Sequence, residues 1–353
     1  MEKWQKLLKD SITNFEQLNS ALAAKNITTD KIISSLDLQF PFKINPYYFN
    51  LIQAENDPIW KQSIPSIKEL NDNICIADPL GEEAHSPTPG LVHKYPDRVL
   101  LLVTNQCSMY CRFCTRNRKV GQKCMSLSEN DLDKCFDYIR KNKNVREVLI
   151  SGGDPLLLSD NMLDKILSEL RKINNVEIIR IGSRIPCTLP QRITDSLVET
   201  LKKYHPLYIN THFNHPQELT DEAYIACTKL ADAGIPLGCQ TVLLKDVNDS
   251  SEVLKELFLG LLKMRVKPYY LFQADLTRGT NHFRTHSKVG IQIMKELYCY
   301  ISGMAVPRLA LDAPGGKGKI PLSPEYVLQH GENLIFKNYL DEVCEYPEVI
   351  DYL

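Results

Sequence analysis

Hydrophobic residues follow two patterns in the larger part of the chain. From Arg98 onward, near-continuous apolar runs alternate with stretches whose apolar residues recur every three or four positions. Such runs are typical of buried parallel strands, and the wider spacing is typical of helices packed on them. The expected strands are RVLLLVT (98–104), EVLIS (147–151), EIIRIGS (177–183), LYINTH (207–212), GCQTVLL (238–244) and KPYYLFQ (267–273). The expected helices include 128–142, 161–173 and 195–204.

The order of these segments predicts an α/β fold. Six strand and helix repeats exceed what one small open sheet holds comfortably, and they suit a partial or full β/α barrel. Active residues of such barrels lie at the carboxyl ends of the strands. Polar and glycine-rich segments follow the expected strands at 105–118, 151–160, 182–186, 211–216 and 273–279. We therefore expect the functional face at that edge.

Residues 1–90 show a different pattern. Apolar residues from Glu2 to Asn19 have helical spacing, and short amphipathic pieces broken by prolines lead to a turn-rich loop at 78–90. We expect a helical N-terminal extension (1–90) packed on a barrel core (91–305), and a C-terminal segment (306–353) that could close the barrel mouth. A separate helical domain with its own partner is the alternative, which the modest size of the segment disfavours.

Composition narrows the class of protein. The formal net charge is -1, so no overall basic field would recruit nucleic acid or an anionic membrane. No apolar stretch approaches the roughly 20 residues of a membrane helix. The eleven cysteines are dispersed outside one cluster, and the charged, amphipathic start does not resemble a secretory signal. We expect a reducing, cytoplasmic location.

Three cysteines, Cys107, Cys111 and Cys114, follow the first expected strand with the spacing CxxxCxxC. Thiolates are the usual ligands of iron–sulfur clusters, and three of them on a four-iron cube would leave one iron open to a small molecule. Buried structural thiols and a structural zinc site are the alternatives. The nearest fourth ligand for zinc, Cys124, lies ten residues beyond Cys114 and has no paired cysteine. The spacing therefore favours a cluster with an open iron.

Two glycine-rich segments are candidate ligand contacts. Gly152 and Gly153 follow the second expected strand, where paired glycines let a ligand approach the backbone, although a simple turn is the alternative. Near the end of the chain, LALDAPGGKGKIPL (309–322) places Lys317 and Lys319 in a flexible run. Such a lysine can contact a phosphate, act as a nucleophile or be merely solvated.

These motifs resemble those of the lysine 2,3-aminomutase family. Its members are radical S-adenosylmethionine (SAM) enzymes that also use pyridoxal 5′-phosphate (PLP). The resemblance covers about residues 88–330 and lies in CSMYCRFCTR, SGGDPLLLSD, RIGSRIP, LPQRIT, NTHFNHP, PYYLFQADL, HFRT and DAPGG with its following GK. It implies a partial (β/α)6-type barrel of the radical SAM kind, a [4Fe-4S] cluster, SAM and PLP.

The resemblance assigns the cluster and SAM to particular residues. Cys107, Cys111 and Cys114 would ligate the cluster, whose open iron would bind the amino and carboxylate groups of SAM. Further SAM contacts would come from Gly152, Gly153, Asp154 and Gln240. Other residues on the predicted face are Arg184, His212 and His215, and for the histidines a structural role is as reasonable as a catalytic one.

The PLP site departs from the family pattern at two positions. Lys319 matches the lysine that forms the internal aldimine with PLP, and Arg98 and Lys94 match the region that holds the PLP phosphate and ring. Position 94 is commonly arginine in the family, and lysine there keeps the charge without the bidentate fork. Lys317 stands where the family usually has glycine, as a phosphate contact or an exposed charge.

Two acidic residues bear on the choice of substrate. A bound lysine would carry its ε-ammonium deep in the pocket, and a buried cation needs anionic partners. Asp275 and Asp312 lie at expected strand ends and match the family's ε-ammonium ligands, whereas glutamate-specific relatives lack this pair. Loop solvation or helix capping is the alternative. Arg116 matches the arginine that binds the substrate carboxylate.

The resemblance implies an isomerase that interconverts L-lysine and β-lysine, with a flavodoxin- or ferredoxin-type reductant. An aminomutase for another amino acid, and β-lysine supply for elongation factor P with a protein-docking role, are the alternatives. Longer family members bind zinc through a C-terminal cysteine cluster and a cysteine near position 250. Ser250 and the lone Cys344 predict no such zinc here, and they weaken any inference about a homo-oligomer.

Overall fold

The computed structural model describes residues 1–27, 40–122 and 127–349, so Cys124 lies outside the described residues. A nine-stranded sheet runs in chain order from β1 to β9. Strands β2 to β8 are parallel, and β1 and β9 pair antiparallel at the two edges. The strands are β1 (Leu91–Tyr95), β2 (Arg98–Thr104), β3 (Glu147–Gly152), β4 (Ile178–Gly182), β5 (Leu207–Thr211), β6 (Leu237–Leu243), β7 (Val266–Gln273), β8 (Arg308–Asp312) and β9 (Lys319–Pro321).

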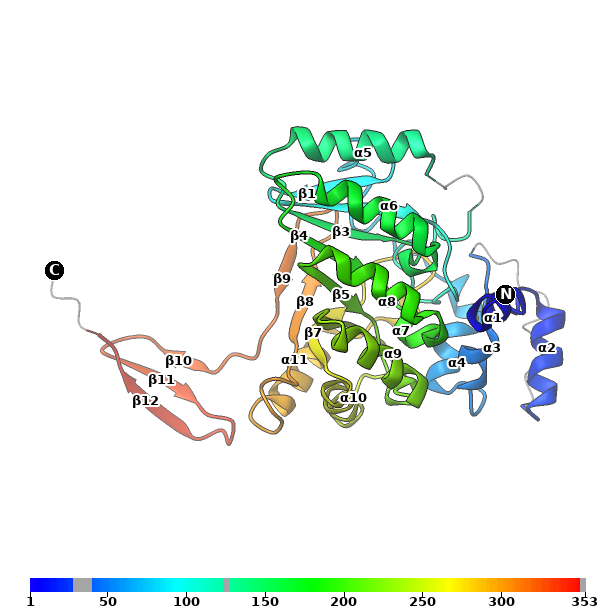
Figure 1. The fold of residues 1–353 in the computed structure, drawn as a ribbon. Coiled ribbons are helices and arrows are strands. Elements are labelled where there is room, and N and C mark those ends of the chain that lie inside the picture. Colours follow the sequence, from blue (N-terminus) through cyan, green and yellow to red (C-terminus); the bar gives the residue numbers. More distant parts are fainter. Residues whose placement is uncertain (28–39, 123–126, 350–353) are drawn as a thin grey trace.

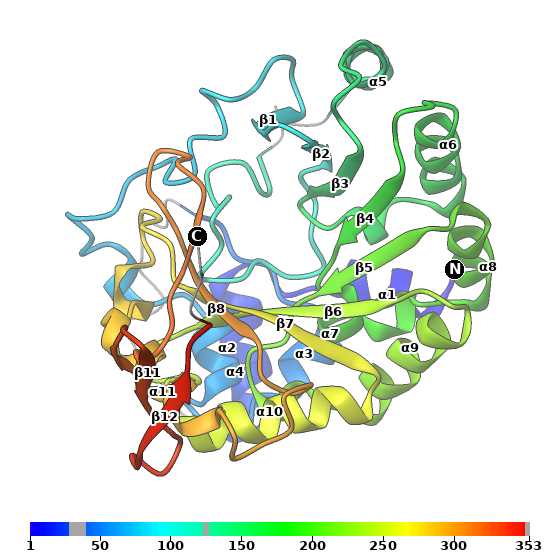
Figure 2. The same cartoon turned by 90° about the vertical axis from the view of Figure 1, so that its left-hand side faces the viewer.

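The sheet curves into an open arc with helices along its outer side (Figure 2). These helices are α5 (Glu129–Lys141), α6 (Asp160–Arg171), α7 (Ile185–Thr188), α8 (Asp195–Leu201), α9 (Asp221–Asp232), α10 (Ser251–Lys263) and α11 (Ser287–Leu297). Helix α5 shows why these segments form: Ser128 caps its first turn by accepting from the Asp131 amide, and its apolar stripe is buried. The predicted α/β partial barrel and its six strands are confirmed.

The N-terminal segment differs from the expected helix over Glu2–Asn19. It forms two helices, α1 (Lys3–Lys9) and α2 (Phe15–Ala24), which are followed by α3 (Pro46–Asn50) and α4 (Pro58–Ser63). The prediction of one helical run was wrong because Ile12 pairs with Ile44 through two backbone hydrogen bonds, and because Asn14 caps a new helix by accepting from the Gln17 amide.

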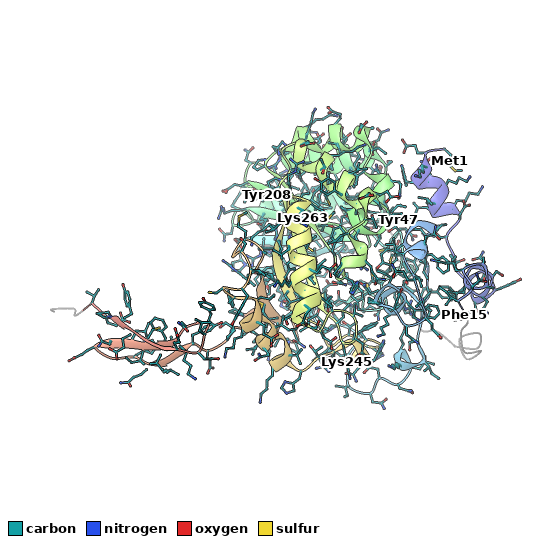
Figure 3. All side chains as sticks on the ribbon, turned by 90° about the horizontal axis from the view of Figure 1, so that it is seen from below. Met1, Phe15, Tyr47, Tyr208, Lys245 and Lys263 are labelled. Atoms are coloured by element: carbon teal, nitrogen blue, oxygen red, sulfur yellow. The ribbon has the colours of Figure 1, made fainter. Side chains whose placement is uncertain are left out.

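The C-terminal segment divides into two parts. Strands β8 and β9 extend the main sheet, whereas β10 (Val327–Gln329), β11 (Asn333–Lys337) and β12 (Val343–Pro347) form a separate antiparallel sheet. We call residues 326–347 the arm. It projects from the body on the side opposite the N-terminal helices (Figures 1 and 3). The arm therefore points away from the barrel, and only the β8–β9 hairpin lies where the expected mouth closure would be.

Arg112, between two cysteines of the CxxxCxxC loop, joins that loop to the N-terminal extension. Its side chain is buried and forms an ion pair with Glu69, with Nε 2.9 Å from Oε1. The same guanidinium donates to the carbonyls of Phe40 and Pro41 at 3.2 and 2.9 Å. Backbone and side-chain acceptors from two segments of the extension thus share one buried cation. None of the helices that the structure describes is long and apolar enough to cross a membrane.

We expect Arg112→Ala to lower the free energy of unfolding by about 3 kcal/mol, because it leaves the Glu69 carboxylate, only 9% exposed, without its partner. Urea unfolding followed by circular dichroism would measure this loss. The control is Arg146→Ala, which removes an ion pair to Glu177 whose side chains are both more than half exposed and should cost less than about 1 kcal/mol. Equal losses in both variants would contradict the anchoring role.

Candidate active site

One cavity of about 940 Å³ inside the arc is lined by most of the residues that the sequence singled out for a site, although His215 is not among them. Its lining includes Cys107, Cys111, Cys114, Gly152, Gly153, Asp154, Gln240, Lys94, Arg98, Arg116, Asp275, Asp312 and Lys319. The carboxyl ends of parallel strands meet at one edge of a sheet, which is why segments more than 200 residues apart converge here. Lys317 is not part of this lining, so Lys319 is the lysine of the glycine-rich run that faces the cavity.

The three cysteines of the loop after β2 lie near one another in the lining of the cavity. Burial, followed by the neighbouring Cys111, raises the pKa of Cys114 to about 12. Burial, Asp154 and the other two thiols raise the pKa of Cys107. Thiolates are therefore unfavourable here unless positive charge is supplied between them, which is the condition that an iron–sulfur cluster meets.

The cysteine thiols do not form a site for a single ion. Among the described residues, no three His, Cys, Asp or Glu side chains converge where one metal ion would bind. A cluster instead takes its cysteine ligands on separate iron atoms, which matches thiols that border a common space. The donor set therefore fits a cluster, and the roles of Cys107, Cys111 and Cys114 as ligands stay a prediction.

Gly152 and Gly153 bring the end of β3 into direct contact with the cysteine loop. A β-carbon on Gly152 would lie 2.2 Å from the Thr104 carbonyl oxygen, and one on Gly153 would lie 2.3 Å from that of Gln106. Gly152 also has φ +134°, a conformation that favours glycine. Close packing against the backbone of Thr104 and Gln106 thus explains why both residues are glycine. Their contact with SAM stays a prediction.

Asp154 ties this glycine turn to the next strand. Its carboxylate accepts from the Ser183 hydroxyl at 2.6 Å and from the Arg184 amide at 2.7 Å. Burial raises the pKa of Asp154 to about 6, and these hydrogen bonds oppose the rise. Asp154 therefore holds the loops after β3 and β4 together at the edge of the cysteine cluster.

The β8–β9 hairpin fixes Lys319 against Asp312. The two residues are cross-strand partners, and Lys319 Nζ lies 2.9 Å from each carboxylate oxygen of Asp312. The hairpin turn uses Gly316 with φ +79°, where a β-carbon would lie 2.7 Å from His85 Cε1. Gly316 is therefore required by the turn and by its packing on the loop at 78–90.

A group of opposite charges surrounds the Lys319 side chain. Burial and the neighbouring Asp312 raise the pKa of Asp275 to about 7, and Lys319 and Lys94 oppose the rise. Burial lowers the pKa of Lys94, although Asp312 opposes that change. Two carboxylates and two amines thus lie close together in the lining of the cavity.

Glu82 is a residue of the cavity that sequence reasoning missed. Its carboxylate, only 4% exposed, accepts from Arg116 Nε at 2.7 Å. Arg118 and Lys119 lie 3.6 and 3.8 Å from the other oxygen. The pairing spans 34 residues and comes from a loop whose sequence indicates only turns, so no local pattern could have revealed it. Glu82 orients the guanidinium that the resemblance assigns to a substrate carboxylate.

Comparison with known proteins agrees with this arrangement. Family models match at residues 101–258 for the radical SAM superfamily and at residues 294–353 for lysine-2,3-aminomutase. The L-lysine 2,3-aminomutase of Methanococcus maripaludis is 50% identical over 99% of this chain and 82% of its own length. That of Fusobacterium nucleatum is 48% identical over 99% of this chain and 83% of its own length.

The chain belongs to the lysine 2,3-aminomutase family. A family member with another named substrate, the glutamate 2,3-aminomutase of Clostridioides difficile, is 45% identical over 94% of this chain and 79% of its own length. The SAM-bound structure of Streptococcus suis SuiB has a TM-score of 0.47 and 15% identity, over 62% of this chain and 51% of SuiB. That likeness is too weak to add to the family assignment.

Membership of the lysine 2,3-aminomutase family implies a [4Fe-4S] cluster, SAM and PLP as cofactors. The residues present fit these groups. The buried thiols need positive charge between them, and Lys319 offers a primary amine at the cavity wall. Lys94 and Arg98 add two cations to the same lining for an anionic group such as a phosphate.

The pKa of Asp275 gives a testable consequence for stability. Its folded value of about 7 lies above the ordinary 3.8, so the folded state binds more protons and its stability falls as the pH rises between these values. Asp275→Asn should therefore stabilise the cofactor-free protein at pH 8, by up to roughly 4 kcal/mol for three pKa units. The gain should be smaller near pH 5.

Thermal unfolding of the cofactor-free protein at several pH values between 5 and 8 would measure this difference. The matched control is Asp195→Asn, since the Asp195 side chain is 87% exposed and should show no such dependence. A loss of stability in Asp275→Asn at pH 8, or a gain that is independent of pH, would show that the cavity does not disfavour the carboxylate.

Proposed function

We propose that this protein interconverts L-lysine and β-lysine by moving the amino group between the α- and β-carbons. The observation that carries the proposal is the pair Asp275 and Asp312 in the same cavity as the cysteine triplet and Lys319. Two buried carboxylates are a binding site for a cation that enters the cavity. Lysine has such a cation on its side chain, and glutamate has the opposite charge.

The structure itself holds a chemical stand-in for the substrate's ε-ammonium. The Lys319 ammonium group is a primary alkylammonium, and Asp312 accepts from it through both oxygens at 2.9 Å. An ε-ammonium of a bound lysine offers the same donors and the same charge. We therefore assign the two aspartates to the ammonium end of the substrate and Arg116 to its carboxylate end.

The other residues of the cavity bind and orient the cofactors. Cys107, Cys111 and Cys114 would hold the cluster, and the residues for SAM would be Gly152, Gly153, Asp154 and Gln240. Lys319, with Lys94 and Arg98, would hold PLP. When bound, these groups supply homolytic C–H chemistry and electron delocalisation beside the migrating nitrogen. The chain supplies orientation and a space shielded from water, because the barrel walls surround the reacting groups.

The second candidate is an aminomutase for another amino acid, which the glutamate-named relative favours. In that case the aspartate pair would have no cationic partner on the substrate. The two candidates are separated by the substrate itself and by the effect of removing one carboxylate. A flavodoxin- or ferredoxin-type protein is the proposed reductant in both.

The test is anaerobic incubation of the reconstituted protein with L-lysine, SAM, PLP and dithionite. β-Lysine should form and be detected by mass spectrometry. Asp275→Asn should lower kcat/KM for L-lysine on the order of 100-fold, since a buried ammonium loses a charged partner. Asp195→Asn, on the exposed end of α8, should leave it unchanged.

Protein that carries the cluster and PLP, as shown by its absorbance, and makes no β-lysine with SAM in excess would contradict the proposal. Product from L-glutamate but not from L-lysine, with Asp275→Asn unimpaired, would support the second candidate instead. Both reactions are assayed on the same preparation, so poor reconstitution cannot be mistaken for either result.

We also propose that the protein forms a homo-oligomer through the arm. Its sheet has three strands, and Val327, Leu328, Val343 and Tyr346 expose between 45% and 62% of their surface. A small sheet that exposes apolar side chains in this way is marginal in water unless something packs on it. A second copy of the chain is the occupant that we propose.

Light scattering after size-exclusion chromatography should give a mass of two or more chains. Val343→Lys with Tyr346→Lys should shift that mass to a single chain, because the charges would be buried at the contact. Tyr224→Lys, at a similarly exposed residue on α9, is the control and should leave the oligomer intact. A single-chain mass for the unmodified protein would contradict the proposal.

A further inference from the structure

A buried arginine contacts one of the three cysteines. Arg184 follows β4 and is only 8% exposed, and its Nη1 donates to Cys111 Sγ at 2.9 Å. Its backbone amide donates to Asp154 at 2.7 Å, so one residue links the cysteine loop and the glycine turn. The guanidinium also lies 5.2 Å from the ring centre of Phe113, in the same cysteine loop. Arg184 is therefore fixed relative to the thiols.

The position of Arg184 is set by acceptors from other parts of the chain. Its Nη2 donates to Glu218 Oε1 and to Gln62 Oε1, both at 2.7 Å. Glu218 is fully buried and also accepts from the Tyr48 hydroxyl at 2.6 Å. The backbone amides of Asn214 and His215 donate to its second oxygen at 2.6 and 3.1 Å.

Glu218 thus accepts from four donors, and one of them is the Arg184 guanidinium. The result is a buried chain of cysteine, arginine and glutamate that is built from the barrel and from α3 and α4 of the N-terminal extension. A buried ion pair is expensive compared with apolar packing, so stability alone is a weak reason for it. Because Arg184 of this ion pair contacts the Cys111 thiol, the pair points to a role at that cysteine.

We propose that Arg184 is a positioning residue for Cys111 that raises the reduction potential of the cluster, and that Glu218 limits this effect. The proposal rests on Cys111 being a cluster ligand, as in the proposed function. A reduced cluster carries one more negative charge than an oxidised one. Hydrogen bonds to the ligand sulfur and a nearby positive charge therefore favour the reduced form. The anion of Glu218 acts in the opposite direction.

Substitution of Arg184 and substitution of Glu218 should shift the midpoint potential of the cluster in opposite directions. Arg184→Gln removes a cation and should make the midpoint potential more negative. Glu218→Gln leaves the arginine without its counter-charge and should make it less negative. We expect about a tenfold change in the ratio of reduced to oxidised cluster at a fixed poise, or about 59 mV for a one-electron couple. A residue that merely supports the fold would not give shifts of opposite sign.

The experiment is a redox titration of the reconstituted full-length protein, followed by electron paramagnetic resonance, without SAM or lysine. The control is Arg192→Gln. Arg192 is another buried arginine with an acidic partner, Asp160, at 2.7 Å, and it donates to the carbonyls of Leu156 and Leu158 rather than to a cysteine. The midpoint potential of this variant should equal that of the unmodified protein.

Opposite shifts in Arg184→Gln and Glu218→Gln, with no shift in Arg192→Gln, would establish the proposal. Equal potentials, or shifts of the same sign, in variants with a full complement of iron would overturn it. If Arg184→Gln assembles no cluster, Glu218→Gln decides alone, and the absence of a positive shift overturns the proposal. Aminomutase activity is not part of this readout, so a different substrate for the enzyme would leave the result interpretable.

Discussion

The parallel hydrogen bonding of β2 to β8 is the constraint on which the rest of the structure depends. It places the carboxyl end of each strand at one edge, so the loops that follow the strands must share one space. Cys107, Gly153, Arg184 and Asp275 come from four different loops, yet all of them line one cavity. No pair of these residues is close in the sequence, and the sheet alone brings them together.

The cavity contains ionisable groups whose charged forms are disfavoured in the protein without its cofactors. The pKa of Cys114 is raised to about 12 and that of Asp275 to about 7, because burial and neighbours of like charge disfavour their ionised forms. Each group is better satisfied by a positive partner that comes from outside the chain. The same buried groups that would bind the cofactors and a cationic substrate therefore lower the stability of the empty protein. Function and stability are linked in this way.

The N-terminal extension takes part in this arrangement and is more than a cover. Arg112 is held by Glu69 and by two carbonyls of the extension, and Arg184 is held by Gln62. Arg112 is part of the cysteine loop, and Arg184 donates to Cys111 of that loop. The segment therefore stabilises the geometry of the thiols, although its own sequence carries no motif of the site.

The sequence by itself determined the strands, the helices after them and the candidate site residues, most of which line the cavity. Apolar periodicity depends on local burial, and motif spacing depends on local backbone geometry, so both are readable along the chain. It did not reveal the break between α1 and α2, the direction of the arm, or the partners Glu82, Gln62 and Glu218. Only the tertiary structure decided these, because pairing of Ile12 with Ile44, of Glu82 with Arg116 and of Glu218 with Arg184 joins segments that are distant in the chain and carry no shared local pattern.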